Sequence, residues 1–190
     1  MGVKNLVPAA VTGLLLSAAV SVAPAAAQQP SLATDSSFMQ MVGSVGLLQV
    51  KLGKVVEDKG SSAAVLEFGR RMVADYTKAN EELAAAAKQA AFPAPVLLRE
   101  HQRIADRFAR MGRGSFDKNY MAEMVKRHSE AVRLFQQESE GGRVQSLKQL
   151  ASRMLPQLQQ RLTLATQTAG AVGADVTASS SEPDVRSTSN

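Results

Sequence analysis

Apolar residues recur at intervals of three and four along most of the chain, which is the period of an amphipathic α-helix. No segment shows the alternation of apolar and polar residues that is typical of a half-buried β-strand. The pattern predicts five helices, over residues 36–58, 62–91, 96–111, 115–138 and 144–168. Glycine or proline residues lie in the intervals between them. Pro156 lies inside the fifth helix, and we expect it to kink or split that helix.

Long helices joined by short turns favour antiparallel neighbours, so the pattern predicts an all-α helical bundle. The third helix is the shortest of the five, and we expect it to cap or cross a bundle of the other four. The predicted domain spans residues 36–168. Residues 171–190 are rich in Ser, Thr and Ala and have no helical period, which predicts a disordered C-terminal tail.

The first thirty residues have the pattern of a secretory signal peptide. Lys4 precedes an apolar stretch over residues 6–22, and the small residues Ala25, Ala26 and Ala27 precede Gln28. We expect cleavage near Ala27, and the alternative is that residues 1–27 are retained as a membrane anchor. After cleavage no later segment is apolar enough to span a membrane. We therefore expect a periplasmic, secreted or envelope-associated protein.

Composition excludes several classes of function. The chain of 190 residues has no Cys, which excludes disulfides, thiolate metal sites and a cysteine nucleophile. Its two His residues cannot form a three-histidine metal site within one subunit. Eight aromatic residues without Trp argue against stacking platforms for bases or sugars, and export argues against a nucleic-acid partner. Since neither a nucleophile elbow nor a phosphate-binding glycine loop is present, we expect a non-enzymatic protein without a cofactor.

Three motifs carry a resemblance to a known family: Phe68-x-x-Arg71-Met72-Val73-x-Asp75-Tyr76-x-x-Ala79-Asn80, Phe116-Asp117-x-x-Tyr120-x-x-x-Met124-Val125-x-x-His128, and Leu155-Pro156-x-Leu158. Together they resemble a bacterial family that consists of a domain of unknown function and is often labelled predicted outer membrane protein. The resemblance covers about residues 36–168. It implies secretion and a ferritin-like four-helix bundle, and it implies no established activity. The family usually has His where this chain has Tyr76 and Arg161, so that only His128 of this set is kept.

The resemblance would bring Asp75, Tyr76, His128 and Arg161 to one level of the bundle. Asp75 and Arg161 could form a charge-assisted pair, and the Tyr76 hydroxyl could donate to His128. We interpret the four residues as an internal polar layer that fixes the register of the helices. His101 also lies on an apolar stripe, and we expect it, like His128, to be a core histidine satisfied by hydrogen bonds.

Metal binding is the alternative function. A diiron site needs Glu-x-x-His pairs, but Leu98 and Val125 stand three residues before His101 and His128, so we expect no such site. His128 with Met121 and Met124 is a weak candidate for binding copper, because thioether and imidazole groups suit Cu(I). The methionines could equally fill irregular gaps between helices.

Four arginines form a stripe on the third predicted helix: Arg99, Arg103, Arg107 and Arg110. Such a stripe is either a solvated face or a contact surface for anionic envelope components, such as phospholipid head groups or lipopolysaccharide. The sequence therefore favours a soluble, non-enzymatic binding or structural protein of the envelope, whose ligand and partner it does not identify.

Overall fold

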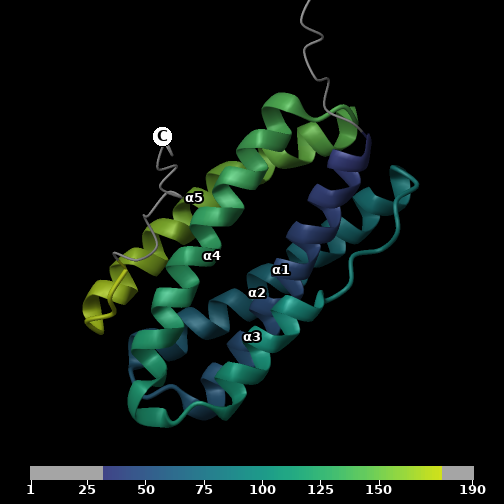
Figure 1. Cartoon of the computed structure of the whole chain (residues 1–190). Coiled ribbons are helices and arrows are strands. Elements are labelled where there is room, and N and C mark those ends of the chain that lie inside the picture. The colour runs from purple at the N-terminus through teal and green to yellow at the C-terminus, as the bar shows by residue number, and fades with distance from the viewer. Residues whose placement is uncertain (1–31, 177–190) are drawn as a thin grey trace, which may run out of the picture.

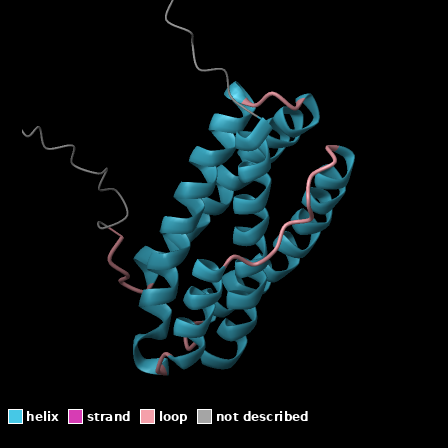
Figure 2. Cartoon of the chain, turned by 45° about the vertical axis from the view of Figure 1, so that its right-hand side comes forward, coloured by secondary structure: helices cyan, strands magenta, loops and turns pink. Residues whose placement is uncertain are grey.

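The computed structural model describes residues 32–176 as an arrangement of five helices (Figure 1). They are α1 (Leu32–Lys59), α2 (Ala63–Gln89), α3 (Arg99–Arg110), α4 (Arg113–Gly141) and α5 (Gln145–Ala171). No strand occurs within residues 32–176 (Figure 2), so the predicted all-helical class is confirmed. The predicted signal peptide at 1–27 lies outside the described residues, as do residues 177–190 of the predicted tail.

Two helix boundaries differ from the sequence prediction. The first helix begins at Leu32, four residues earlier than predicted, and this places Asp35 in its first turn. The last helix continues to Ala171, and the Ala174 amide then donates to the Ala169 carbonyl at 2.9 Å. Pro156 does not split α5, because the helix is continuous on both sides of this exposed residue.

The four long helices form a ring in the order α1, α2, α5, α4. The closest packing is within two hairpins, α1 with α2 and α4 with α5, and α1–α4 and α2–α5 contacts close the ring. The start of α1 lies at the start of α5, and the end of α1 lies at the start of α4. All neighbouring helices in the ring are therefore antiparallel, whereas α2 and α4, which lie on a diagonal, run in the same direction.

A single long connection over residues 90–112 joins α2 to α4 and contains α3. Its first part lies on α1, where the Gln40 side chain donates to the Pro93 carbonyl at 2.9 Å. A Cβ atom at Gly43 would collide with the Pro95 ring, so this close approach requires glycine. The short helix packs along the side of α1, so it covers a side of the bundle and does not cap its end (Figure 1).

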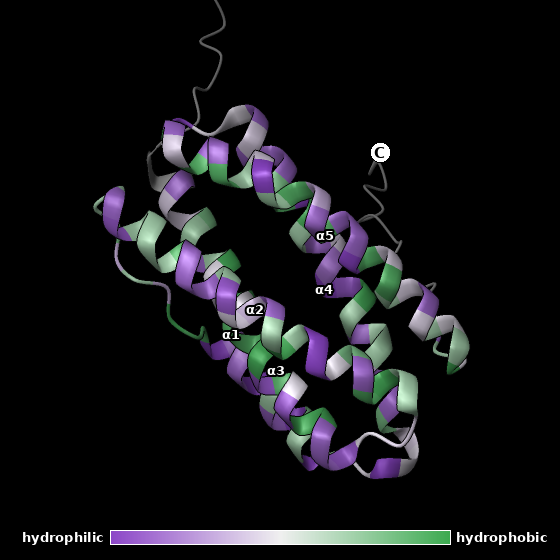
Figure 3. Cartoon of the chain, turned by 180° about the vertical axis from the view of Figure 1, so that it is seen from behind, coloured by the Kyte–Doolittle hydropathy of each residue, from purple (hydrophilic) through white to green (hydrophobic). Residues whose placement is uncertain are grey.

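The buried apolar side chains follow the predicted apolar stripes. Figure 3 shows how apolar and polar residues alternate along the helices. An aromatic cluster fills the half of the bundle nearer the start of α4. There the Phe116 and Tyr120 rings stack with centroids 5.7 Å apart, and Phe108 of α3 meets Phe116 edge-on at 6.0 Å. This contact attaches α3 to the core despite its position outside the four-helix ring.

A carboxylate caps a helix at each end of the bundle. The Asp117 carboxylate, from α4, accepts hydrogen bonds from the amides of Ser61 and Ser62 before α2. The Asp35 carboxylate, from α1, accepts from the amides of Arg143 and Val144 before α5. Neither α2 nor α5 has a cap from its own N-cap side chain, so each hairpin supplies the cap of the other.

Candidate functional site

The predicted polar layer comes together at the centre of the bundle. The Tyr76 hydroxyl lies 3.2 Å from His128 Nε2, and His128 Nδ1 lies 2.8 Å from the Met124 carbonyl oxygen. A carbonyl only accepts, so Nδ1 carries the proton and donates to it, and Nε2 accepts from the Tyr76 hydroxyl. Both ring nitrogens of His128 are therefore engaged.

The charged half of the layer lies beside this pair. Arg161 Nε is 3.2 Å from Asp75 Oδ2, and the Arg161 guanidinium stacks over the Tyr76 ring at 5.1 Å from its centroid. The Asp75 carboxylate also lies 3.8 Å from Arg71 Nε, at the edge of the bundle. One guanidinium nitrogen of Arg161, Nη1, is buried and has no hydrogen-bond partner among the described residues.

Burial fixes the charge states in the layer. Burial lowers the pKa of His128 to about 4, against the raising effect of the Met124 hydrogen bond, so the imidazole is neutral at pH 7. Burial raises the pKa of Tyr76 to about 12. The cavity next to Tyr76 has a volume of about 10 Å³. A space of this size holds about one water molecule, so it admits no larger ligand beside the buried Tyr76.

The copper candidates are buried in the core around this layer. Met121 and Met124 are fully buried, as is His128. A metal ion at Nε2 would have to displace the Tyr76 hydroxyl, and one at Nδ1 would have to break the bond to the Met124 carbonyl. Within residues 32–176, no group of three or more His, Asp or Glu residues could hold a metal ion.

His101 is a buried histidine that ties the crossover to α1. Its Nδ1 lies 2.6 Å from the Ser44 hydroxyl, which also accepts from the Leu98 amide at 2.8 Å. The direction of the Ser44–His101 bond depends on the tautomer of the ring, and His101 Nε2 lies 3.9 Å from Glu100 Oε1. Although serine, histidine and glutamate are aligned, Ser44 is fully buried and already bonded, so the arrangement is a structural tie.

The arginine stripe of α3 lies at the surface. Arg99, Arg103, Arg107 and Arg110 are all exposed, and Arg107 pairs with Glu123 of α4 at 2.7 Å. Arg103 has no ion-pair partner among the described residues, and it lines a groove between α1, α3 and α4 of about 450 Å³. Apolar side chains and His101 form the floor of the groove, and charged side chains line it: Glu100, Arg103, Arg127, Glu130 and Arg133.

Sequence analysis missed two arginines of this groove, Arg127 and Arg133, because they belong to α4. Arg127 is neutralised by Glu123 and Glu130, each at 2.7 Å, whereas Arg133 makes one hydrogen bond of 3.4 Å to Gln137. Their positions in the sequence do not predict that they lie near the arginines of α3, because only the packing of α3 against α4 brings the two groups together.

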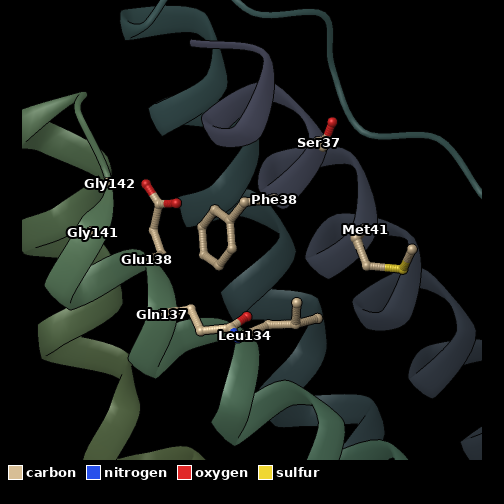
Figure 4. Close-up of a pocket in the computed structure, with 8 residues that line it drawn as sticks. All are labelled: Ser37, Phe38, Met41, Leu134, Gln137, Glu138, Gly141 and Gly142. Atoms are coloured by element: carbon tan, nitrogen blue, oxygen red, sulfur yellow. The ribbon is translucent and has the colours of Figure 1, made fainter. Parts of the chain in front are cut away.

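A second pocket lies between the start of α1 and the end of α4 (Figure 4). It has a volume of about 420 Å³ and a mostly apolar wall, to which Phe38, Met41 and Leu134 contribute. Glu138 is the one charged side chain in that wall, and Figure 4 shows its carboxyl group beside the Phe38 ring. The sequence predicts a helix over residues 115–138 but does not single out Glu138, although the buried Phe135 lies three residues before it. Continuing from Phe135 by one step of three would have placed Glu138 on the buried face.

These features define a class of protein: an all-helical bundle with a buried polar layer and open pockets on its surface, among them the two described above. The sequence model of a family described as a domain of unknown function (DUF4142) matches residues 20–168. The chain therefore belongs to this family, and the resemblance noted above is confirmed. No curated protein and no solved structure matches the chain. None of the helices within residues 32–176 is both long and apolar enough to cross a membrane.

Proposed function

We propose that this chain is an exported, non-enzymatic protein of the bacterial periplasm or envelope that binds anionic envelope components through the groove between α1, α3 and α4. The signal-peptide pattern of residues 1–27 supports export. We further propose that the bundle is ferritin-like, which is supported by the one long crossover between α2 and α4.

The observation that carries the binding function is the pair of arginines on the two sides of this groove. Arg103 and Arg133 are exposed and have no carboxylate partner among the described residues. Between them lies a floor of apolar side chains that includes Ile104 and Leu134. A phosphate group with attached acyl chains matches both parts, since the phosphate meets the guanidinium groups and the chains meet the floor.

Vesicle binding tests this function. Phosphatidylcholine vesicles with and without phosphatidylglycerol are sedimented with the wild-type protein and with the Arg103→Ala/Arg133→Ala variant. At about 1 kcal/mol for each arginine near an anionic surface, the double variant should bind phosphatidylglycerol vesicles roughly 30-fold more weakly. Added salt should weaken the wild-type binding in the same direction.

A charge-matched control is available on the opposite side of the bundle. Lys78 of α2 and Arg153 of α5 are both exposed, and the Lys78→Ala/Arg153→Ala variant removes the same net charge. It should bind nearly as well as the wild type. If the control loses as much affinity as the groove variant, or if phosphatidylglycerol makes no difference, the groove is not an anion-binding site.

A further inference from the structure

The second pocket contains a carboxyl group that the fold itself does not require. Glu138 is 4% exposed, and its Oε1 atom is buried without a hydrogen-bond partner among the described residues. An unpaired buried acceptor is costly, and buried polar groups without partners are rare in folded proteins. The position of Glu138 therefore needs an explanation beyond stability.

The opposite end of the bundle shows what the fold needs at this position. The Gly142 amide donates to the Glu138 carbonyl at the end of α4, and the Gly60 amide donates to the Val56 carbonyl at the end of α1. Val56 in the hairpin of α1 and α2 is therefore equivalent to Glu138 in the hairpin of α4 and α5. It is fully buried and apolar, and the helix cap on its side is made by Asp117 alone.

The cap on the Glu138 side is likewise complete without Glu138. Asp35 makes it through hydrogen bonds of 3.0 to 3.2 Å to two amides. The Glu138 carboxyl group lines the pocket, and its buried Oε1 atom has no hydrogen-bond partner among the described residues.

The charge around Glu138 favours a cation. The charged groups that act on it are Asp35 of α1, which repels a second negative charge, and Lys148 of α5, which partly offsets it. Burial and Asp35 together raise the pKa of Glu138 to about 7, so near neutral pH the carboxyl is poised between its two forms. A cation in the pocket would stabilise the ionised form and occupy the free oxygen.

We propose that this pocket binds a small apolar molecule that carries an amino group. The ammonium group pairs with the Glu138 carboxylate, whose buried Oε1 atom turns towards the pocket to accept from it. The apolar part lies against Phe38, Met41 and Leu134 (Figure 4). The volume of about 420 Å³ is within the range of small-molecule pockets. This pocket adjoins the groove between α1, α3 and α4, since Met41 and Leu134 line both. Glu138 lines the pocket alone and Arg103 and Arg133 line the groove alone, so substitutions at these residues test the two sites independently.

A set of three probes with the same eight-carbon chain tests the proposal. Octylammonium, octanol and octanoate are titrated into the full ¹⁵N-labelled chain at pH 8. Dissociation constants are obtained from the Gly142 amide signal, because Gly142 lines this pocket and not the groove. Octylammonium should bind tightest, octanol more weakly and octanoate weakest. Octylammonium binding should also tighten as the pH rises through about 7. Equal affinity for octylammonium and octanol would overturn the proposal.

Two substitutions separate the carboxyl group from the apolar wall. Glu138→Gln should weaken octylammonium binding by about tenfold or more, remove its pH dependence and leave octanol binding unchanged. Glu140→Gln, which alters an exposed residue on the same helix, should change none of these values. Glu138→Val introduces the residue found at the equivalent position of the other hairpin, Val56, and this variant checks that the fold tolerates loss of the carboxyl group. If octylammonium binds both Glu138 variants as tightly as it binds the wild type, the site is refuted. Both variants should bind phosphatidylglycerol vesicles as the wild type does, because the groove is unchanged.

Discussion

Two of the buried polar clusters within residues 32–176 differ in whether a ligand can enter. In the central layer both ring nitrogens of His128 are bonded, and the adjacent cavity of about 10 Å³ admits no more than about one water molecule. In the cluster of Asp35 and Glu138, one carboxyl oxygen is unpaired in the wall of a pocket of about 420 Å³. The first cluster has the properties of a structural element, and the second has those of a binding site.

The two clusters also differ in the sign of their pH dependence. His128 has a pKa of about 4 in the folded protein and 6.5 in the unfolded chain, so the unfolded chain binds more protons between these values. Stability from this residue is therefore lost as the pH falls from 6.5 to 4. Glu138 keeps its proton in the folded protein up to about pH 7, so its contribution is lost as the pH rises from 4.5 to 7.

The largest expected effect is the loss of stability in acid. His128 should cost about 3 kcal/mol of unfolding free energy between pH 6.5 and pH 4, measured by denaturant unfolding at a series of pH values. Gln has no titrating side chain, so the unfolding free energy of the His128→Gln variant should fall much less between pH 6.5 and pH 4. His101, whose pKa burial also lowers, accounts for the slope that remains. If the His128→Gln variant lost as much unfolding free energy in acid as the wild type, the central layer would not be closed to water.

The next effect comes from the charged half of the central layer. Arg161→Leu removes the closer of the two arginine partners of Asp75 and the cation over the Tyr76 ring. Because Asp75 is about one-third exposed, the loss should be about 2 kcal/mol, below that of a fully buried pair, and the Tm should fall by roughly 4–8 °C. Arg153→Leu changes an exposed arginine on the same helix and should leave the Tm nearly unchanged. A similar Tm for all three proteins would mean that Arg161 is effectively solvated.

Glu138 should give a smaller effect of opposite sign. The Glu138→Gln variant avoids the charge that the wild type acquires in this partly open site, so it should be more stable by about 1–2 kcal/mol at pH 8. At pH 4.5, where Glu138 is protonated in the folded protein, the two should be equally stable. Thermal unfolding at both pH values measures the difference. A variant that is less stable at pH 8 would indicate that the carboxylate supports the fold.

The sequence predicts the helices well because their apolar period is regular over long segments. It also places Tyr76 and His128 on inner faces, and the family resemblance adds Asp75 and Arg161 at the same level of the bundle. It does not reveal Asp35 or Glu138 as partners, since more than a hundred residues separate Asp35 from the amides that it caps. Such contacts depend on how the two hairpins dock, and no local pattern records that docking.

Hydrogen bonding at the two tyrosines is a further property that the apolar period does not distinguish. Tyr76 and Tyr120 both lie on inner stripes and both are buried, but only the Tyr76 hydroxyl has a partner, His128, among the described residues. Tyr76→Phe should therefore leave His128 Nε2 unpaired and cost about 1 kcal/mol. Tyr120→Phe removes a buried hydroxyl with no such partner, so stability should be unchanged or slightly higher. Denaturant unfolding of both variants at pH 7 measures the contrast, and equal losses would show that the central layer gains nothing from the bond between Tyr76 and His128.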